Sequence, residues 1–146
     1  MANLNNLIEV VELNNTADLA HATVKSNYVD LAGYSGCILV ACIGTMTGAD
    51  SSNHVTPVVQ ESDTTKDSDF ATATDVVASP AFSKVNSGDK DNVTQTSVYI
   101  GSKRYVRIQW TVVSAGSYPT GPVIGLAILS KAMREPPAAP PTGAAV

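Results

Sequence analysis

The chain has 146 residues, of which 44% are hydrophobic and only 15% are charged, and its formal net charge is −4 at pH 7. A length of about 150 residues is typical of one domain, and so low a charge content excludes a disordered polyelectrolyte, a coiled coil and a charge-rich helical bundle. Because nucleic-acid binding requires a basic surface, the acidic balance also predicts that the protein makes no direct contact with nucleic acid.

The apolar runs are too short to cross a membrane. The longest, residues 37–43 and 122–129, fall far below the roughly 20 residues that span a bilayer. The N-terminus lacks the cationic start of a secretory signal, since the first basic residue is Lys25. We therefore expect a protein that is made in the cytoplasm and has no membrane partner.

In chain order, the segments between turn signals are typical of β structure, because they are rich in valine, threonine and alanine. Seven segments predict strands, and residues 70–77 form either a helical turn or an eighth short strand. Strands this short need a second layer over their apolar face, so we predict an all-β, single-domain antiparallel β-sandwich that is jelly-roll-like. The predicted strands are residues 7–13, 22–31, 37–45, 55–62, 93–100, 103–113 and 122–131.

Two of these segments carry positional information. Residues 37–45 are apolar on both faces, which predicts a central strand that is covered on each side. Pro57 cannot donate to a ladder, which places its strand at an edge or near its own start. Cys37 and Cys42 lie about 16 Å apart on opposite faces of one strand, so we expect no disulfide between them.

The chain divides into three parts. Residues 1–21 are an N-terminal arm or first strand, residues 22–134 form the β-sandwich domain, and residues 135–146 are a tail rich in proline and alanine. The prolines of this tail favour a stiff, extended polyproline II conformation. The tail is either a disordered end or an arm that docks on a neighbouring chain.

Residues with catalytic or metal-binding chemistry are few. His21 and His54 lie in polar connecting segments, and neither has neighbours at the spacing of a metal site. The acidic tract 61–69 offers oxygen ligands for calcium, but its spacing does not match the EF-hand loop. We therefore predict a protein that is not an enzyme and has no cofactor, metal or catalytic residues.

Residues 103–113 form the most informative segment, because strand alternation assigns one of its faces to the core and the other to the outside. The core face carries Val106, Ile108, Trp110 and Val112, and the outer face carries Tyr105, Arg107, Gln109 and Thr111.

Basic residues are concentrated at the start of this segment. Lys103, Arg104 and Arg107 are three of the nine lysines and arginines of the chain. Arg104 has the parity of the core face, where an unpaired charge is costly, so we predict an ion pair with Glu61 or Asp63. The basic residues are either an ordinary polar strand end or a contact surface for an acidic neighbour.

Several segments in a fixed order resemble a known class of protein. They are Tyr-Ser-Gly at 34–36, Gln-Glu-Ser-Asp at 60–63, Phe70 within a loop, Tyr-Ile-Gly-Ser-Lys-Arg-Tyr-Val-Arg at 99–107, and Glu-Pro-Pro at 135–137 after an apolar last strand. Over roughly residues 22–137, the chain resembles small virion proteins of tailed bacteriophages that decorate or cement the head.

This resemblance implies a non-enzymatic structural protein without a cofactor. It would assemble as a homotrimer on the outer surface of the capsid, bridge subunits of the major capsid protein and stabilise the shell. Two alternatives remain: a tail, connector or head-fibre-base component of the virion, or a carbohydrate-binding β-sandwich. The rings available for stacking on a sugar are Tyr28, Tyr34, Tyr99, Tyr105, Trp110 and Tyr118.

Overall fold

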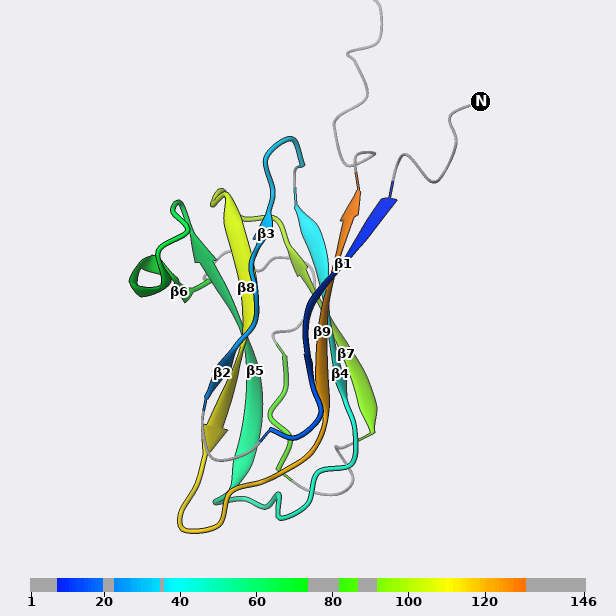
Figure 1. Ribbon diagram of the computed structural model, residues 1–146, viewed down its shortest axis with the longest axis vertical. Helices are drawn as coiled ribbons and strands as arrows, with labels where there is room; N and C mark the ends of the chain where they lie inside the picture. Colours follow the sequence, from blue (N-terminus) through cyan, green and yellow to red (C-terminus); the bar gives the residue numbers. More distant parts are fainter. Residues whose placement is uncertain (1–7, 20–22, 35, 74–81, 87–91, 131–146) are drawn as a thin grey trace, which may run out of the picture.

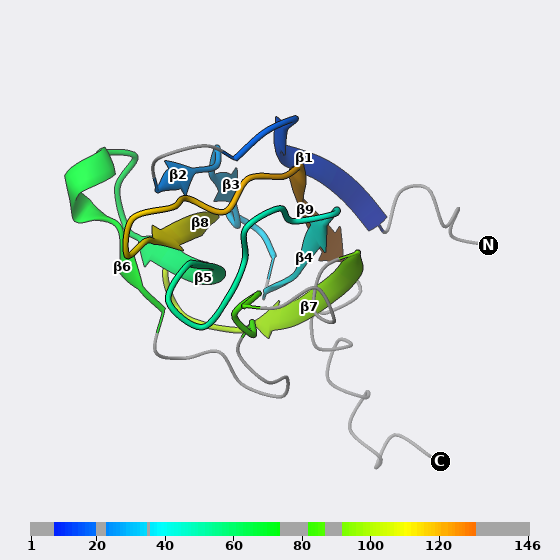
Figure 2. The same ribbon diagram turned by 90° about the horizontal axis from the view of Figure 1, so that it is seen from below.

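The computed structural model describes residues 8–19, 23–34, 36–73, 82–86 and 92–130. These residues are nearly all β, with one 3-10 turn, η2 (Asp67–Asp69), and they form two antiparallel sheets packed face to face (Figures 1 and 2). The strands are β1 (Ile8–Thr16), β2 (Val24–Lys25), β3 (Val29–Asp30), β4 (Cys37–Ile43), β5 (His54–Ser62), β6 (Ala71–Thr72), β7 (Val93–Tyr99), β8 (Tyr105–Val113) and β9 (Val123–Ser130).

The strand order confirms the predicted sandwich. One sheet, here called sheet A, has the order β1-β9-β4-β7, and the other, sheet B, has the order β2-β8-β5-β6, with β3 also paired to β8. Most connections cross from one sheet to the other, so strands that are neighbours in sequence face each other across the core. Sheet A has four strands and sheet B has five, of which β2 and β3 lie one after the other along β8. Two layers wound in this way have the arrangement of a jelly roll.

Most predicted strand boundaries shift by one or two residues, and two strands differ more. The first strand runs to Thr16 and pairs with β9 along its length, so the sandwich begins at β1 and not at residue 22. The predicted strand 22–31 is broken into β2 and β3 at Ser26 and Asn27. Ser26 still bonds to β8, since its N–H donates to the Ile108 carbonyl, whereas Asn27 bonds to the other sheet. The N–H of Ile108 donates to Ser26 Oγ, and the N–H of Asn27 donates to the Leu13 carbonyl in sheet A. The proposed tail 135–146 and residues 1–7 lie outside the described residues.

Pro57 is the fourth residue of β5, near the start of its strand as one of the two predicted placements requires, while β5 itself lies between β8 and β6 and is not an edge strand. β6 pairs with β5 only at Gln60 and Glu61, and an isolated bridge joins Val55 to Val85. The Val59 carbonyl accepts a further bond from the Ala73 N–H. Among the described residues, positions 56–58 of β5 have strand pairing only on their β8 side. The missing N–H of Pro57 therefore costs no ladder hydrogen bond.

The two cysteines are both free, as predicted. β4 lies between β9 and β7, and its alternation sends Cys37 into the core and Cys42 to the opposite face. Burial raises the pKa of the Cys37 thiol to about 12. The two sulfur atoms therefore differ in exposure.

A bulge in β1 provides the hydrogen-bond acceptor for the indole N–H of the single tryptophan, Trp110. The register shifts between Glu12 and Asn14, so the buried Leu13 is followed by an asparagine whose Oδ1 accepts a hydrogen bond of 3.1 Å from Trp110 Nε1. A Cβ atom at Gly125 would lie 2.5 Å from that oxygen. Glycine in β9 therefore leaves the space that the asparagine side chain occupies.

Replacing this acceptor tests the role of the bulge. Asn14→Ala leaves the indole N–H buried without a partner, and we expect it to lower the free energy of unfolding by about 1–3 kcal/mol. Urea denaturation followed by the fluorescence of Trp110 measures the change. Asn15→Ala is the control, because Asn15 is exposed and its loss should change stability by less than about 0.5 kcal/mol. Equal midpoints for the two variants would contradict this role.

Candidate assembly interface

The basic residues singled out in the sequence lie at the start of β8 and on the outer face of sheet B, and each has a partner within the chain. Lys103 Nζ lies 2.5 Å from Asp63 Oδ2, and this pairing raises the pKa of the lysine. Glu61 accepts a hydrogen bond of 2.5 Å from the hydroxyl of Tyr99. The pKa of Tyr99 is raised, mainly because the side chain is removed from water and also because of this hydrogen bond.

Arg104 pairs with Asp30, so the predicted partners Glu61 and Asp63 are wrong. Its Nε and Nη2 donate to the two carboxylate oxygens at 2.9 and 2.8 Å. β3 pairs with β8 and places Asp30 opposite Tyr105, which brings the carboxylate beside the arginine. The Arg104 side chain is 55% exposed, so core parity does not bury it. The hydrogen bonds from Arg104 lower the pKa of Asp30.

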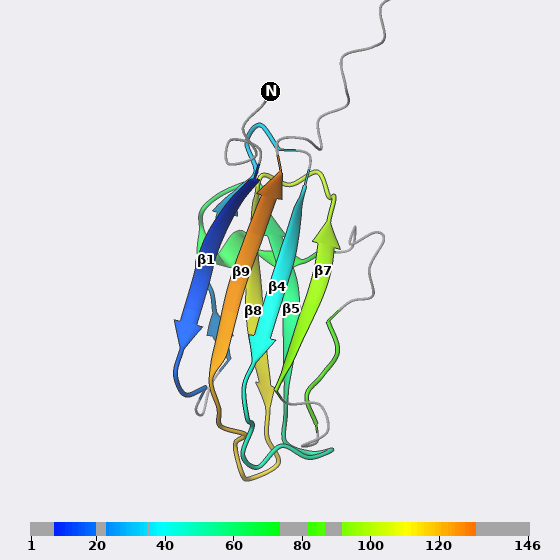
Figure 3. The same cartoon turned by 90° about the vertical axis from the view of Figure 1, so that its right-hand side faces the viewer.

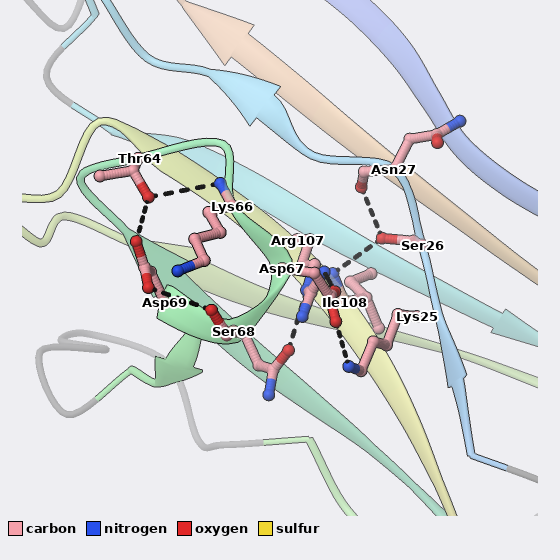
Figure 4. A network of polar contacts seen from close by, with 11 residues as sticks. Lys25, Ser26, Asn27, Thr64, Lys66, Asp67, Ser68, Asp69, Arg107 and Ile108 are labelled. Atoms are coloured by element: carbon pink, nitrogen blue, oxygen red, sulfur yellow. Dashed lines mark hydrogen bonds and ion pairs between the residues drawn. The ribbon is translucent and has the colours of Figure 1, made fainter.

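Arg107 points to the outer face, as predicted, but it is only 5% exposed. The loop of residues 63–70 folds over it (Figure 4). Its guanidinium donates to Asp67 Oδ1 at 2.6 Å and to Gln60 Oε1 at 2.9 Å, and it lies 4.1 Å from the centre of the Phe70 ring. The acidic tract that was considered for calcium thus supplies the counterion of a buried arginine.

Asp67 joins this loop to a second strand. Its other carboxylate oxygen lies 2.6 Å from Lys25 Nζ in β2, and hydrogen bonds from Lys25 and then Arg107 hold its pKa below the ordinary value. Within the loop, Thr64 Oγ1 donates to Asp69 at 2.6 Å. The five candidate contact residues from the sequence are therefore engaged in holding strand ends and this loop in place.

The rings proposed for sugar stacking do not form one surface. Tyr99 and Trp110 are fully buried. Tyr28 contacts Phe70 and Tyr105, with ring centroids 6.0 and 5.3 Å apart. This small cluster packs beside the loop that covers Arg107.

Figure 3 shows the four strands of sheet A side by side, in the order β1-β9-β4-β7. The outer face of this sheet is different in kind, because its two central strands, β9 and β4, carry apolar outward side chains. The paired registers place its outward side chains in rows. Three rows extend across all four strands, and we call these three rows the aliphatic face; Ile8 of β1 and Ser130 of β9 form a further pair beside them. The rows are Val10-Ile128-Ile38-Val98, Glu12-Leu126-Val40-Thr96 and Asn15-Ile124-Cys42-Thr94, each in the order β1-β9-β4-β7. Glu12 is the only charged residue in these rows.

Most side chains of the aliphatic face are at least partly accessible to solvent, although Val40 at its centre is only 8% exposed. The outward residues of β9 alternate as half-buried positions with fully buried inward ones, and on β1 Val10 is 60% exposed. Residues 37–45 were expected to be covered on each side, but among the described residues only the inward side has a covering sheet. In the sequence, this face is indicated by residues 37–45, which are apolar at successive positions and not only at every second one. That pattern does not show which side of the strand stays open.

A shallow hollow of about 240 Å³ lies at one end of the aliphatic face. It lies where the end of β4 and the start of β9 meet the connections next to them, and the residues that line it are apolar. Its lining residues are Cys42, Ile43, Gly44, Pro122 and Ile124.

The histidines and acidic residues form no recognisable catalytic group in the described ranges. His54 begins β5, and its Nδ1 is buried without a hydrogen-bond partner; His21 lies outside the described residues. No cluster of three potential metal ligands occurs in the part of the chain that is described. No helix there is long and apolar enough to cross a membrane.

Comparison of the chain with protein-family models, with curated proteins and with solved structures gave no match.

Because Arg107 is buried and Arg104 is exposed, we expect Arg107 to contribute more to the stability of the fold than Arg104 does. Arg107→Ala removes hydrogen bonds to Gln60 and Asp67 and the contact with Phe70, and we expect it to lower the free energy of unfolding by about 1.5–3 kcal/mol. Arg104→Ala is the matched control and should leave the urea midpoint nearly unchanged, because water screens an exposed ion pair. Equal losses in the two variants would show that the loop does not depend on Arg107.

Proposed function

We propose that the chain is a non-enzymatic virion protein that decorates the head of a tailed bacteriophage and stabilises it by bridging subunits of the major capsid protein. The observation that carries this proposal is the aliphatic face of sheet A. Exposed, continuous apolar patches mark sites of protein–protein contact on soluble domains. A protein with such a face is suited to permanent assembly with its neighbours.

The distribution of charge supports the same role. The candidate basic and acidic residues on sheet B are engaged in ion pairs and hydrogen bonds within the chain, while the aliphatic face holds a single charged residue, Glu12. Interfaces between proteins are depleted of charge at their centre. The molecule therefore offers apolar contact area in place of a polar site for a small substrate.

The resemblance of the sequence segments to head-decoration proteins supports the location. In this proposal the chain is made in the host cytoplasm and acts as a homotrimer on the outer surface of the capsid, with the major capsid protein as its partner. Several copies that bind together make each further contact intramolecular, so a set of weak contacts becomes a stable attachment.

Reconstituted heads test this function. Purified protein is added to expanded heads assembled without it, and binding is followed by sedimentation and electron microscopy. We expect saturation at a fixed number of copies in ordered positions on the outer shell, together with a higher temperature of head disruption. A β-sandwich protein of similar size and charge is the control.

Two outcomes would contradict the proposal. Failure to bind such heads would exclude decoration, and density confined to the tail, the connector or the base of a head fibre would move the protein to another part of the virion.

A further inference from the structure

The aliphatic face is graded from its centre to its borders. The central strands β9 and β4 carry apolar side chains in all three rows, whereas within these rows the border strands β1 and β7 are apolar only at Val10 and Val98. Next to Val10, β1 carries one more exposed apolar residue, Ile8, which is 47% exposed. In the other two rows the borders are polar, with Glu12 and Asn15 on β1 and two threonines on β7. An apolar centre within a partly polar rim is the usual anatomy of a protein interface.

The face has the size of a small interface. Four strands spaced by about 4.8 Å give a width of roughly 19 Å, and eight residues that each rise about 3.3 Å give a height of roughly 26 Å. Each copy thus offers about 500 Å², and two copies would bury about 1,000 Å², which is the lower limit for a specific interface.

The width of the face matches an assembly of three. If three sheets about 19 Å wide form the sides of a triangular prism, each sheet lies about 5.5 Å from the central axis. Packed sheets are about 10 Å apart, so side chains fill about 5 Å above their own sheet. Three such faces therefore fill the prism with aliphatic side chains and leave no channel, whereas four would leave an open centre.

The borders also match in such a ring. Rotation about an axis parallel to the strands keeps each row at one height and brings β1 of one copy beside β7 of the next. Val10 then meets Val98, apolar against apolar, while Glu12 and Asn15 meet the rows of Thr96 and Thr94, polar against polar. Because the threonines are uncharged, the carboxylate of Glu12 faces no second negative charge at these corners, and no cation is needed there.

The geometry points to self-assembly through this face: three copies of the chain turn their sheets A toward a common axis, and the aliphatic face of each is covered by the other two. This inference rests on the proposed function for the number three, and it names the surface through which the copies meet. Sheet B, with its loop over Arg107, would then face outward and be free to contact the shell.

The two cysteines provide a probe of the covered face that is already in the chain. Cys42 lies on the aliphatic face and is half-buried, whereas Cys37 is fully buried in the core. Burial raises the pKa of Cys37 to about 12, so it forms little thiolate and reacts slowly. A thiol reagent should therefore modify one cysteine per chain when the face is open and almost none when it is covered.

The experiment combines mass with thiol reactivity on the isolated full-length protein. We expect sedimentation equilibrium to give three chains of 15.1 kDa and Cys42 to be protected from dithiobis-nitrobenzoate. Leu126→Glu, which places three carboxylates near the axis, should give monomers in which one thiol reacts rapidly. Thr111→Glu adds the same charge to the outer face of sheet B and should remain trimeric and protected.

A second variant guards against misfolding at the central position. Val10 is 60% exposed, so Val10→Asp should fold normally, with an unchanged circular dichroism spectrum, and weaken the trimer about tenfold or more. An unchanged association constant for this folded variant would overturn the arrangement.

The outcomes separate this inference from the proposed function. A monomeric protein with reactive Cys42 that nevertheless binds heads would overturn self-assembly through this face and leave head decoration standing. A mass of two chains would overturn the ring of three. A protected trimer that does not bind heads would support the ring and refute decoration.

Discussion

The central strands of sheet A carry aliphatic side chains on both faces of the sheet. The rest of the structure depends on how each of these two apolar faces is removed from water. Sheet B covers one face with Ile108, Trp110 and Val106, which are fully buried. The other face, centred on Leu126 and Val40, has no covering layer in the described part of the chain. Because apolar surface in water is unfavourable in proportion to its area, a neighbouring protein is the natural cover for it.

Sheet B follows a different physical rule. Its outer surface is covered locally, by a short loop that folds back on its own strands. Arg107 is the centre of this arrangement, since a buried guanidinium requires a carboxylate, further acceptors and an apolar surface for its flat faces. Asp67, Gln60 and Phe70 supply these in turn. The loop thus has a defined position although it contains little regular structure.

The outer faces of sheet A and sheet B differ in chemistry. One side is largely apolar and nearly uncharged, and the other is polar, internally paired and shaped by a loop. In the proposed virion role, assembly through the first side leaves the second to meet the shell. Closed symmetry then limits growth to a defined cluster and prevents a fibre.

The all-β class, the central position of β4, the place of Pro57 near the start of its strand, the absence of a disulfide and the core face of β8 could be predicted from the residues alone, because each depends on local chemistry or a period of two residues. Tertiary structure decided the pairing of Arg104 with Asp30, the burial of Arg107, the break between β2 and β3, and which side of β4 stays open. These depend on which segments become neighbours in space, across 40 and 74 residues for the two arginine pairs, and alternation along one strand carries no information about that.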